Sequence, residues 1–478
     1  MLFNSLGFAL FLPIVFILYW FVANRNLKFQ NVLLLASSYF FYACWDWRFL
    51  FLLLFSTLLD FLSGIKIEQA KNKNQKKFWF YLSIIINLGF LGFFKYFNFF
   101  AESFGELLSQ FGLQVNPWTL KVILPVGISF YTFHGLSYVI DLYKGRIKAE
   151  RSFLIYGVFV SFFPLLVAGP IERATHLLPQ IQKKRIFEHE KAVDGLRQIL
   201  WGLFKKIVIA DQCAIYANAA FNNSEMHSGS TLLIGAVFFA FQIYCDFSGY
   251  SDIAIGTAKL FGIDLLRNFA FPYFSRDIAE FWRRWHISLS TWFRDYLYIP
   301  LGGSKGNTLT KVRNTFIIFI ISGFWHGANW TFIVWGALNA IYFIPLLLLN
   351  KNRNNLDIIA TGKYLPDIKD LFKMLLTFML VVLAWIFFRA DDLGHAFHYL
   401  CAIFSGSLFN TPLIIPTTIK IFLPCFLLIE WLGREHQFAI SNMRHIKSGL
   451  IRWSVYLIIL AVIYIYSGNS QEFIYFQF

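Results

Sequence analysis

Two histidines, His286 and His326, are the residues of this chain best suited to chemistry. His326 lies inside the apolar run 316–335 (FIIFIISGFWHGANWTFIVW), which is long enough to cross a bilayer. An ionisable residue at that depth is costly unless it faces a cavity or a partner, so it indicates a functional site. Its unperturbed pKa, near ~6.5, suits a general base that deprotonates a hydroxyl for attack on a thioester. The alternative is a neutral histidine that is hydrogen-bonded between helices.

His286 lies in the segment 283–288 (RRWHIS). Arg283, Arg284 and Arg294 are close to it in the sequence, and their charge should disfavour its cationic form. In a functional interpretation His286 orients a reactant and the arginines attract phosphates. In the alternative it is an interfacial histidine among arginines whose charged ends reach the water.

Two carboxylates, Asp246 and Asp252, follow the apolar run 232–243 and need partners. They either line a catalytic cavity or order the arginines of 276–294. We favour a structural interpretation, with helix capping by Ser248 or Ser251 and ion pairing. In AGPIER (168–173) the Gly-Pro pair should end a helix, and Glu172 is expected to pair with Arg173 at the interface.

The composition identifies an integral membrane protein, because 57% of the residues are hydrophobic and only 14% are charged. The net charge of +15 lies in short loops, which favours positive-inside topology and contact with anionic lipid over nucleic-acid binding. Residues 1–22 lack a basic n-region and a cleavage site, so we expect a retained first membrane helix with the N-terminus outside. The five cysteines form no CxxC or Cys/His cluster, so neither a disulfide framework nor a zinc site is indicated.

Apolar runs predict ten to fourteen membrane or re-entrant helices. They lie near 3–22, 30–44, 48–64, 79–99, 118–140, 152–168, 196–218, 229–247, 250–263, 312–325, 330–349, 371–388, 411–432 and 452–467. Segment 275–300 is too rich in charge for a simple span and predicts amphipathic or re-entrant helices at the cytoplasmic interface, ended by Pro300 and Gly302-Gly303. No stretch fits a separate soluble domain, so residues 1–478 are expected to form a single membrane domain.

Several long stretches of this sequence together resemble the membrane-bound O-acyltransferase (MBOAT) superfamily, and in particular its bacterial alginate O-acetyltransferase branch. The stretches are FNSLGFALFLPIVFILYW (3–20), AGPIERATHLLPQI (168–181), YCDFSGYSDIAIGTAKLFGI (244–263), NFAFPYFSRDIAEFWRRWHISLSTWFRDYLYIPLGG (268–303), FWHGANWTFIVWG (324–336), WIFFRAD (385–391) and FIYFQF (473–478). The stretches are distributed along the chain, so the resemblance covers essentially all of it, and the WRRWHISLSTWFRDYLYIPLGG and WHG segments are highly specific.

The resemblance implies an all-α bowl of roughly eleven or more membrane or re-entrant helices around a central tunnel, with a catalytic core at about 120–350. His326 matches the histidine at the tunnel floor and His286 the second histidine, at the cytoplasmic entrance. Acetyl-CoA or another thioester is the implied donor substrate, with no bound cofactor and no metal. The candidates for donor binding are Arg283, Arg284, Arg294, Asp295, Asp252 and Asn329.

In that branch the acetyl group passes across the bacterial cytoplasmic (inner) membrane, where a periplasmic partner of the SGNH-hydrolase type places it on a polysaccharide. Two alternatives stay open. D-alanyl exporters for teichoic acid share similar WHISLSxWFRD and WHG segments and use a thioester carrier protein. A polytopic transporter of polymer or ions is the non-enzymatic alternative, and it predicts that transport survives the loss of both histidines.

Overall fold

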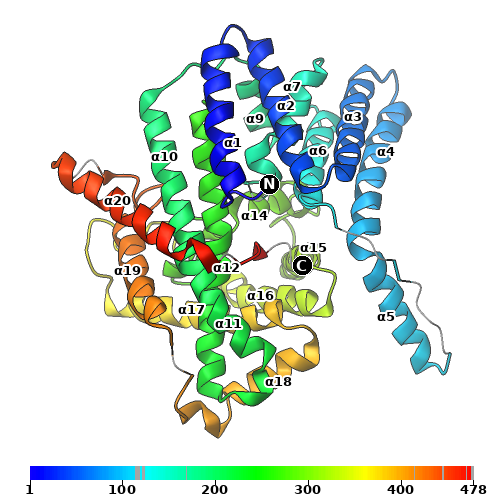
Figure 1. The fold of residues 1–478 in the computed structure, drawn as a ribbon. Coiled ribbons are helices and arrows are strands. Elements are labelled where there is room, and N and C mark those ends of the chain that lie inside the picture. Colours follow the sequence, from blue (N-terminus) through cyan, green and yellow to red (C-terminus); the bar gives the residue numbers. More distant parts are fainter. Residues whose placement is uncertain are drawn as a thin grey trace. The chain divides into compact units, whose positions relative to one another are not determined.

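The described part of the chain is helical. The computed structural model describes residues 1–113, 119–120, 124–167, 169–413, 415–443, 446–469 and 471–474, and these residues form helices and no strand (Figure 1). His445, Ala168 and residues 475–478 of the terminal FIYFQF lie outside the described residues, as do parts of the spans predicted at 118–140, 152–168 and 411–432. The eleven or more membrane helices and the tunnel remain predictions.

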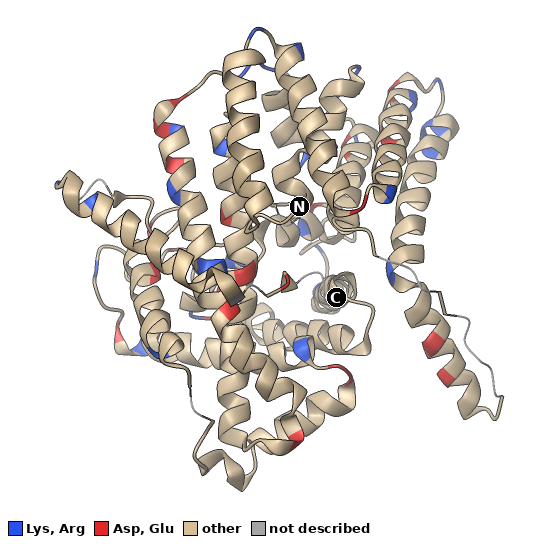
Figure 2. Cartoon of the chain, viewed as in Figure 1, with Lys and Arg blue, Asp and Glu red and all other residues tan. Residues whose placement is uncertain are grey.

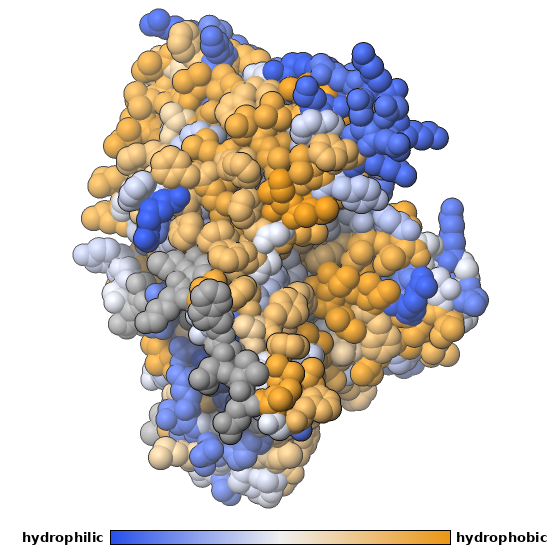
Figure 3. Space-filling view, turned by 90° about the vertical axis from the view of Figure 1, so that its right-hand side faces the viewer, coloured by the Kyte–Doolittle hydropathy of each residue, from blue (hydrophilic) through white to orange (hydrophobic). Residues whose placement is uncertain are grey.

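Six helices of the described part are long and apolar enough to cross a membrane. Their bounds are Arg48–Gln69, Lys73–Gln110, Gly229–Leu260, Trp330–Leu348, Ile368–Arg389 and Gly449–Tyr466. Figure 2 shows most charged residues near the ends of helices, and Figure 3 shows a face on which hydrophobic side chains cover large areas. This distribution suits helices surrounded by lipid, since charge in the hydrocarbon layer is costly. The chain is therefore a membrane protein.

The chain divides into two compact units. The first comprises residues 1–193 and 257–266, and the second residues 194–256 and 267–478. The first contains α1 (Leu6–Ile17), η1 (Leu18–Val22), α2 (Leu27–Asp46), α3 (Arg48–Gln69), α4 (Lys73–Leu91), η2 (Gly92–Tyr96), α5 (Phe97–Gln110), α6 (Ile128–Tyr143), α7 (Phe153–Ser161), α8 (Phe163–Leu166) and α9 (Ala174–Ile181). Helix α10 (His189–Phe204) begins in the first unit and ends in the second.

The second unit contains the remaining helices and most of α12. They are η3 (Lys205–Ala210), α11 (Asp211–Asn222), η4 (Ser224–Met226), α12 (Gly229–Leu260), η5 (Pro272–Phe274), α13 (Ile278–Arg284), α14 (Ile287–Phe293), η6 (Arg294–Tyr298), α15 (Thr308–His326), α16 (Trp330–Leu348), α17 (Ile368–Arg389), α18 (Leu393–Ile403), η7 (Gly406–Phe409), α19 (Thr417–Gly433), α20 (Gly449–Tyr466) and η9 (Ser467–Asn469). The single membrane domain predicted from the sequence remains a prediction.

In the first unit, Glu172 anchors the start of α9 to the chain segment that follows α12. Its carboxylate accepts the backbone N–H of Leu266 at 2.6 Å and lies 2.7 Å from Nδ1 of His176, one helical turn along α9. The pairing of Glu172 with Arg173 that the sequence suggested stays a prediction. The hydrogen bond that His176 donates to the Glu172 carboxylate raises the pKa of His176 above its ordinary value.

This pair should make stability depend on pH. Because the folded-state pKa of His176 is raised, its contribution is fully present below the unfolded pKa of about 6.5 and is lost as pH rises through the folded value. We expect the thermal midpoint in detergent to differ more between wild type and His176→Gln at pH 6 than at pH 8. The effect should be small, about 1 kcal/mol or less, because His176 is partly exposed. His189→Gln, at an exposed histidine, is the control; a difference that grows towards pH 8 would contradict the prediction.

Helix α12 differs from the sequence prediction. The two spans predicted at 229–247 and 250–263 form one continuous helix of 32 residues. Ser248 and Ser251 lie in its middle, so the expectation that they cap a helix was wrong. The polar residues there do not interrupt the helix because protein groups satisfy them: Nζ of Lys205 donates to Ser248 at 2.9 Å and to Asp252 at 2.6 Å.

Segment 275–300 forms short helices, as predicted. Asp277 caps α13, its side chain accepting the N–H of Glu280, and α13 and α14 have seven residues each. They are too short to cross a bilayer. Helix α15 follows and ends at His326, and α16 begins at Trp330, with Asn329 as its N-cap. The α15–α16 turn therefore comes directly after His326.

Candidate functional site

The structure brings the two predicted histidines together. His286, between α13 and α14, and His326, at the end of α15, have ring centroids 6.4 Å apart although 40 residues separate them in the sequence. Both are buried, with 1% and 4% of their surfaces exposed. All of these elements belong to the second unit. Two buried imidazoles at this distance can act on one reacting group between them.

The backbone of His286 is strained. Its φ of 43° and ψ of 54° lie in the left-handed region, which is uncommon for residues other than glycine. The N–H of the next residue, Ile287, donates to the carbonyl of Asn268 at 2.8 Å and so holds the chain in this conformation. Strained residues cluster at functional sites, where the surrounding structure imposes their conformation.

Asn268 also determines which nitrogen of His286 carries the proton. Its Nδ2 donates to Ser251, so its Oδ1 faces His286 and Ser288 as an acceptor. Ser288 donates to this oxygen, and Nδ1 of His286 lies 3.0 Å from it. Nδ1 must then carry the proton, and Nε2 presents a lone pair; Nε2 has no hydrogen-bond partner among the described residues. The sequence interpretation missed Asn268, and its type alone carried no signal.

Burial also keeps His286 neutral. The residue lies outside the six candidate spans, and desolvation lowers its pKa to about 3. Phe247 and Phe269 contribute to this environment, with ring centroids 4.7 and 6.4 Å from the imidazole. A neutral imidazole with Nε2 available can accept a hydrogen bond.

A cavity of about 550 Å³ lies next to this site. Its lining includes Ser322, one helical turn before His326 on α15, and the ring of Trp282. Three cationic side chains also line it: Arg294, Lys311 and Arg353. A cavity with apolar walls and several cations suits a ligand that combines an apolar portion with phosphates.

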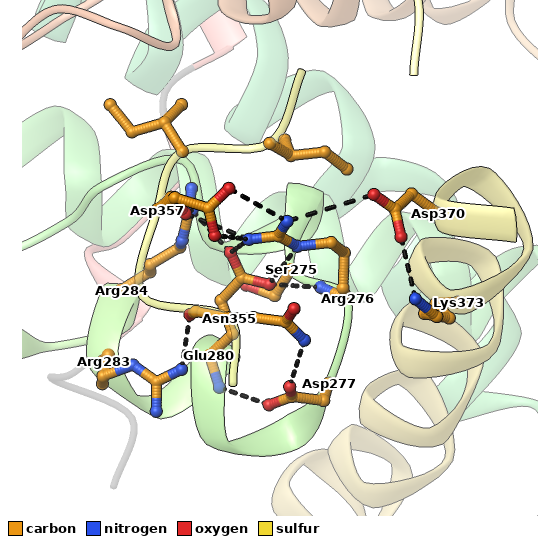
Figure 4. A network of polar contacts seen from close by, with 12 residues as sticks. Ser275, Arg276, Asp277, Glu280, Arg283, Arg284, Asn355, Asp357, Asp370 and Lys373 are labelled. Atoms are coloured by element: carbon orange, nitrogen blue, oxygen red, sulfur yellow. Dashed lines mark hydrogen bonds and ion pairs between the residues drawn. The ribbon is translucent and has the colours of Figure 1, made fainter. Parts of the chain in front are cut away.

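The other predicted arginines hold a loop in place. Figure 4 shows Arg276, Glu280 and Asp357 joined by ion pairs, with Arg284 bound to Glu280 and to the carbonyl of Asp357. Arg283 donates to two backbone carbonyls of the same loop, of Asn352 and Asn355, at 2.8 and 2.7 Å. This loop contributes Asn352 and Arg353 to the cavity wall. Arg283 and Arg284 therefore contact protein oxygens that shape the cavity.

The remaining predicted donor-binding residues lie at different places. Asp295 pairs with Arg294 at 2.7 Å, beside the cavity. Asp252 pairs with Lys205 at 2.6 Å and does not line this cavity. Asn329 caps α16 and donates to the carbonyl of Asp391 at 2.8 Å. Of these six candidates, only Arg294 lines the cavity. Within the described ranges, no group of three or more His, Cys, Asp or Glu residues could hold a metal ion.

A buried lysine was missed by the sequence interpretation. Lys206, 1% exposed, lies 2.8 Å from Asp211 and 2.7 Å from Asp246, and it also donates to the carbonyl of Gln471. Asp246 in turn accepts the N–H of Ile474 at 2.7 Å. The sequence contains a signal for this ion pair, because a lysine in the apolar run 196–218 needs a partner of opposite charge and so does Asp246.

Comparisons with known proteins identify the family of this chain. A model of the membrane-bound O-acyltransferase family matches residues 146–382, which include both histidines. The chain is 41% identical over 408 residues to the "Probable alginate O-acetylase AlgI" of Pseudomonas aeruginosa, covering 85% of this chain and 75% of that protein. It is 33% identical over 535 residues to the peptidoglycan O-acetyltransferase of Helicobacter pylori, covering 100% and 98%.

A third relative has a different acyl group in its name. The teichoic acid D-alanyltransferase of Streptococcus thermophilus is 30% identical over 313 residues, covering 61% of this chain and 75% of that protein. The similarity to the two acetyltransferases is higher and covers more of the chain. The resemblance noted from the sequence is confirmed: the chain belongs to the membrane-bound O-acyltransferase family and is an acyltransferase.

Proposed function

We propose that this protein takes an acetyl group from cytoplasmic acetyl-CoA and transfers it across the bacterial inner membrane for O-acetylation of an extracytoplasmic polysaccharide. The observation that carries the proposal is the buried pair of His286 and His326, with ring centroids 6.4 Å apart, beside a cavity with a cationic lining. The names of two relatives, an alginate O-acetylase and a peptidoglycan O-acetyltransferase, support acetyl as the group and an envelope polymer as the final acceptor.

In the proposed reaction His326 is the general base. It removes the proton of an acceptor hydroxyl as the oxygen attacks the thioester carbonyl carbon. The C–O bond forms, the C–S bond breaks, and the imidazolium returns the proton to the coenzyme A thiolate. His286, with its proton held on Nδ1 by Asn268, accepts a hydrogen bond through Nε2 and orients a reactant.

The cavity supports the donor assignment. Arg294, Lys311 and Arg353 provide charge for the phosphates of coenzyme A, and Ser322 on the cavity wall lies one helical turn from His326. Arg283 and Arg284 act in this proposal by holding the cavity wall. Basic residues gather in segments 64–78 and 304–313, where helices end or begin, and they support a cytoplasmic position for the cavity opening and an outside N-terminus. A periplasmic SGNH-hydrolase-like partner would complete the transfer to the polymer.

The test uses the protein in a membrane. Inside-out vesicles that contain the full chain are given acetyl-CoA labelled in the acetyl group, or a D-alanyl carrier protein. We expect histidine-dependent release of coenzyme A from acetyl-CoA only, and base-labile acetate on the envelope polymer of cells that produce the wild type. Use of the D-alanyl carrier alone would favour the teichoic acid alternative. Polymer acetylation that persists in a His286→Ala/His326→Ala variant would overturn the proposed mechanism.

A further inference from the structure

Three aromatic rings surround His326. The centroids of Trp325, Trp335 and Phe388 lie 4.8, 5.2 and 5.3 Å from that of the imidazole, and we call these three residues the aromatic box. Each of them is at most 5% exposed. The box leaves His326 itself 4% exposed, so little space remains beside the imidazole.

A second layer of rings supports the aromatic box. Trp385 stacks on Trp335 with centroids 5.5 Å apart and lies 5.1 Å from Phe388. Phe332 packs edge-on against Phe388 at 4.9 Å. Because close-packed interiors resist even one additional methylene, the box rings cannot move outwards without displacing this layer.

The backbone also fixes the position of the box. A Cβ on Gly327 would lie 2.0 Å from the Phe332 ring, and one on Gly323 would lie 2.2 Å from the Phe332 carbonyl oxygen. Only glycine permits such close approach of α15 and α16. The Phe332 ring is therefore held against the backbone that directly follows His326.

Trp335 contacts both a ring of the cavity wall and His326. The ring of Trp282, which lines the cavity, is 5.7 Å from that of Trp335. Asn339 accepts the indole N–H of Trp282 at 3.2 Å and holds this ring in place. A thioester that reaches His326 from the cavity therefore brings its acyl chain against Trp335 and the rest of the box.

We propose that the aromatic box limits the acyl group to a short chain of acetyl size, with Trp335 as the main specificity-determining residue. This inference rests on the proposed use of acyl-CoA. An acetyl group presents one methyl to the box, whereas a butyryl group presents two further methylenes to rings that are already packed. Discrimination by a hydrophobic pocket amounts to roughly 10–200-fold for one methylene.

The experiment compares acetyl-CoA with butyryl-CoA as donors in the vesicles described above. We expect kcat/KM of the wild type to favour acetyl-CoA by about 100-fold or more. In Trp335→Leu this ratio should fall by about tenfold or more through a gain in butyryl transfer. Phe388→Leu, at a second box ring, should act in the same direction. Trp201→Leu is the matched control, because Trp201 is fully buried and its ring packs on Phe204 and Phe426.

The outcomes separate this inference from the proposed function. If the wild type releases no coenzyme A from either donor, the proposed function fails and this inference with it. If the wild type uses acetyl-CoA and butyryl-CoA equally well, the inference alone is overturned, even if no variant can be purified. The inference is also overturned if an active Trp335→Leu or Phe388→Leu variant keeps the wild-type ratio of acetyl-CoA to butyryl-CoA use. A Trp201→Leu variant that changes this ratio as much as the box variants do would overturn it as well.

Discussion

Replacing His326 by alanine is expected to lower acyl transfer by about 10²–10⁴-fold, the range that general acid–base catalysis contributes. The residue is buried, ends α15, and lies 6.4 Å from His286 between ring centroids. Alanine also leaves a void inside the aromatic box, so His326→Gln is the sharper variant, since it keeps most of the volume and loses the basic nitrogen. The measurement is the initial rate of coenzyme A release from acetyl-CoA, together with the thermal midpoint of each variant.

His134→Gln is the matched control for His326→Gln. His134 is also a buried histidine, but it lies in the first unit, where its Nε2 accepts the backbone N–H of Glu172 at 3.1 Å. We expect it to retain transfer activity even if its thermal midpoint falls. A His326→Gln variant that is folded and keeps more than a tenth of the wild-type rate would exclude His326 as the general base.

The sequence was sufficient to single out His286 and His326 as candidates, but their proximity could not be derived from it. A histidine within an apolar run is conspicuous because of its cost, and this applies to His326 on α15. The distance to His286 depends on how α13, α14 and α15 pack, which is a long-range property. The role of Asn268 depends on the same packing, since its amide reaches Ser251 and His286 only in the folded chain.

Polar residues inside apolar helices were the main source of error in predicting the bounds of the helices. Hydropathy divides α12 at Asp246–Asp252, but the helix continues because Lys205 and Lys206 satisfy these carboxylates. A span prediction that treats each segment alone cannot include such a partner. The short helices of segment 275–300 were expected from the sequence because its dense charge is a local signal.

Replacing Lys206 by methionine is expected to destabilise the protein by about 3–5 kcal/mol, because breaking a buried ion pair leaves a charge without compensation. Here two carboxylates, Asp211 and Asp246, share the one ammonium group, and the pairs are at most 2% exposed. Methionine keeps the length of the side chain, so the loss of packing should be small. The thermal midpoint in detergent should fall clearly below that of the wild type.

Two further variants identify the cause of the stability that Lys206→Met is expected to lose. Lys373→Met removes an exposed lysine from its pair with Asp370, and it should cost about 1 kcal/mol or less. Adding Asp211→Asn and Asp246→Asn to Lys206→Met removes the uncompensated charges and should restore much of the lost stability. A Lys206→Met variant as stable as Lys373→Met would show that the buried pair contributes little to the fold.

Loss of Lys206 should also lower the rate of acyl transfer, because the same charge cluster holds the end of the described chain. Lys206 donates to the carbonyl of Gln471, and Asp246 accepts the N–H of Ile474. Phe473 lies between these two anchored residues in the sequence, and its ring centroid is 4.3 Å from that of Tyr250 and 6.3 Å from that of Phe247. The ring of Phe247 is in turn 4.7 Å from the imidazole of His286. If this packing positions His286, the rate below the melting transition should fall in Lys206→Met and recover in the triple variant, whereas Lys373→Met should keep the wild-type rate.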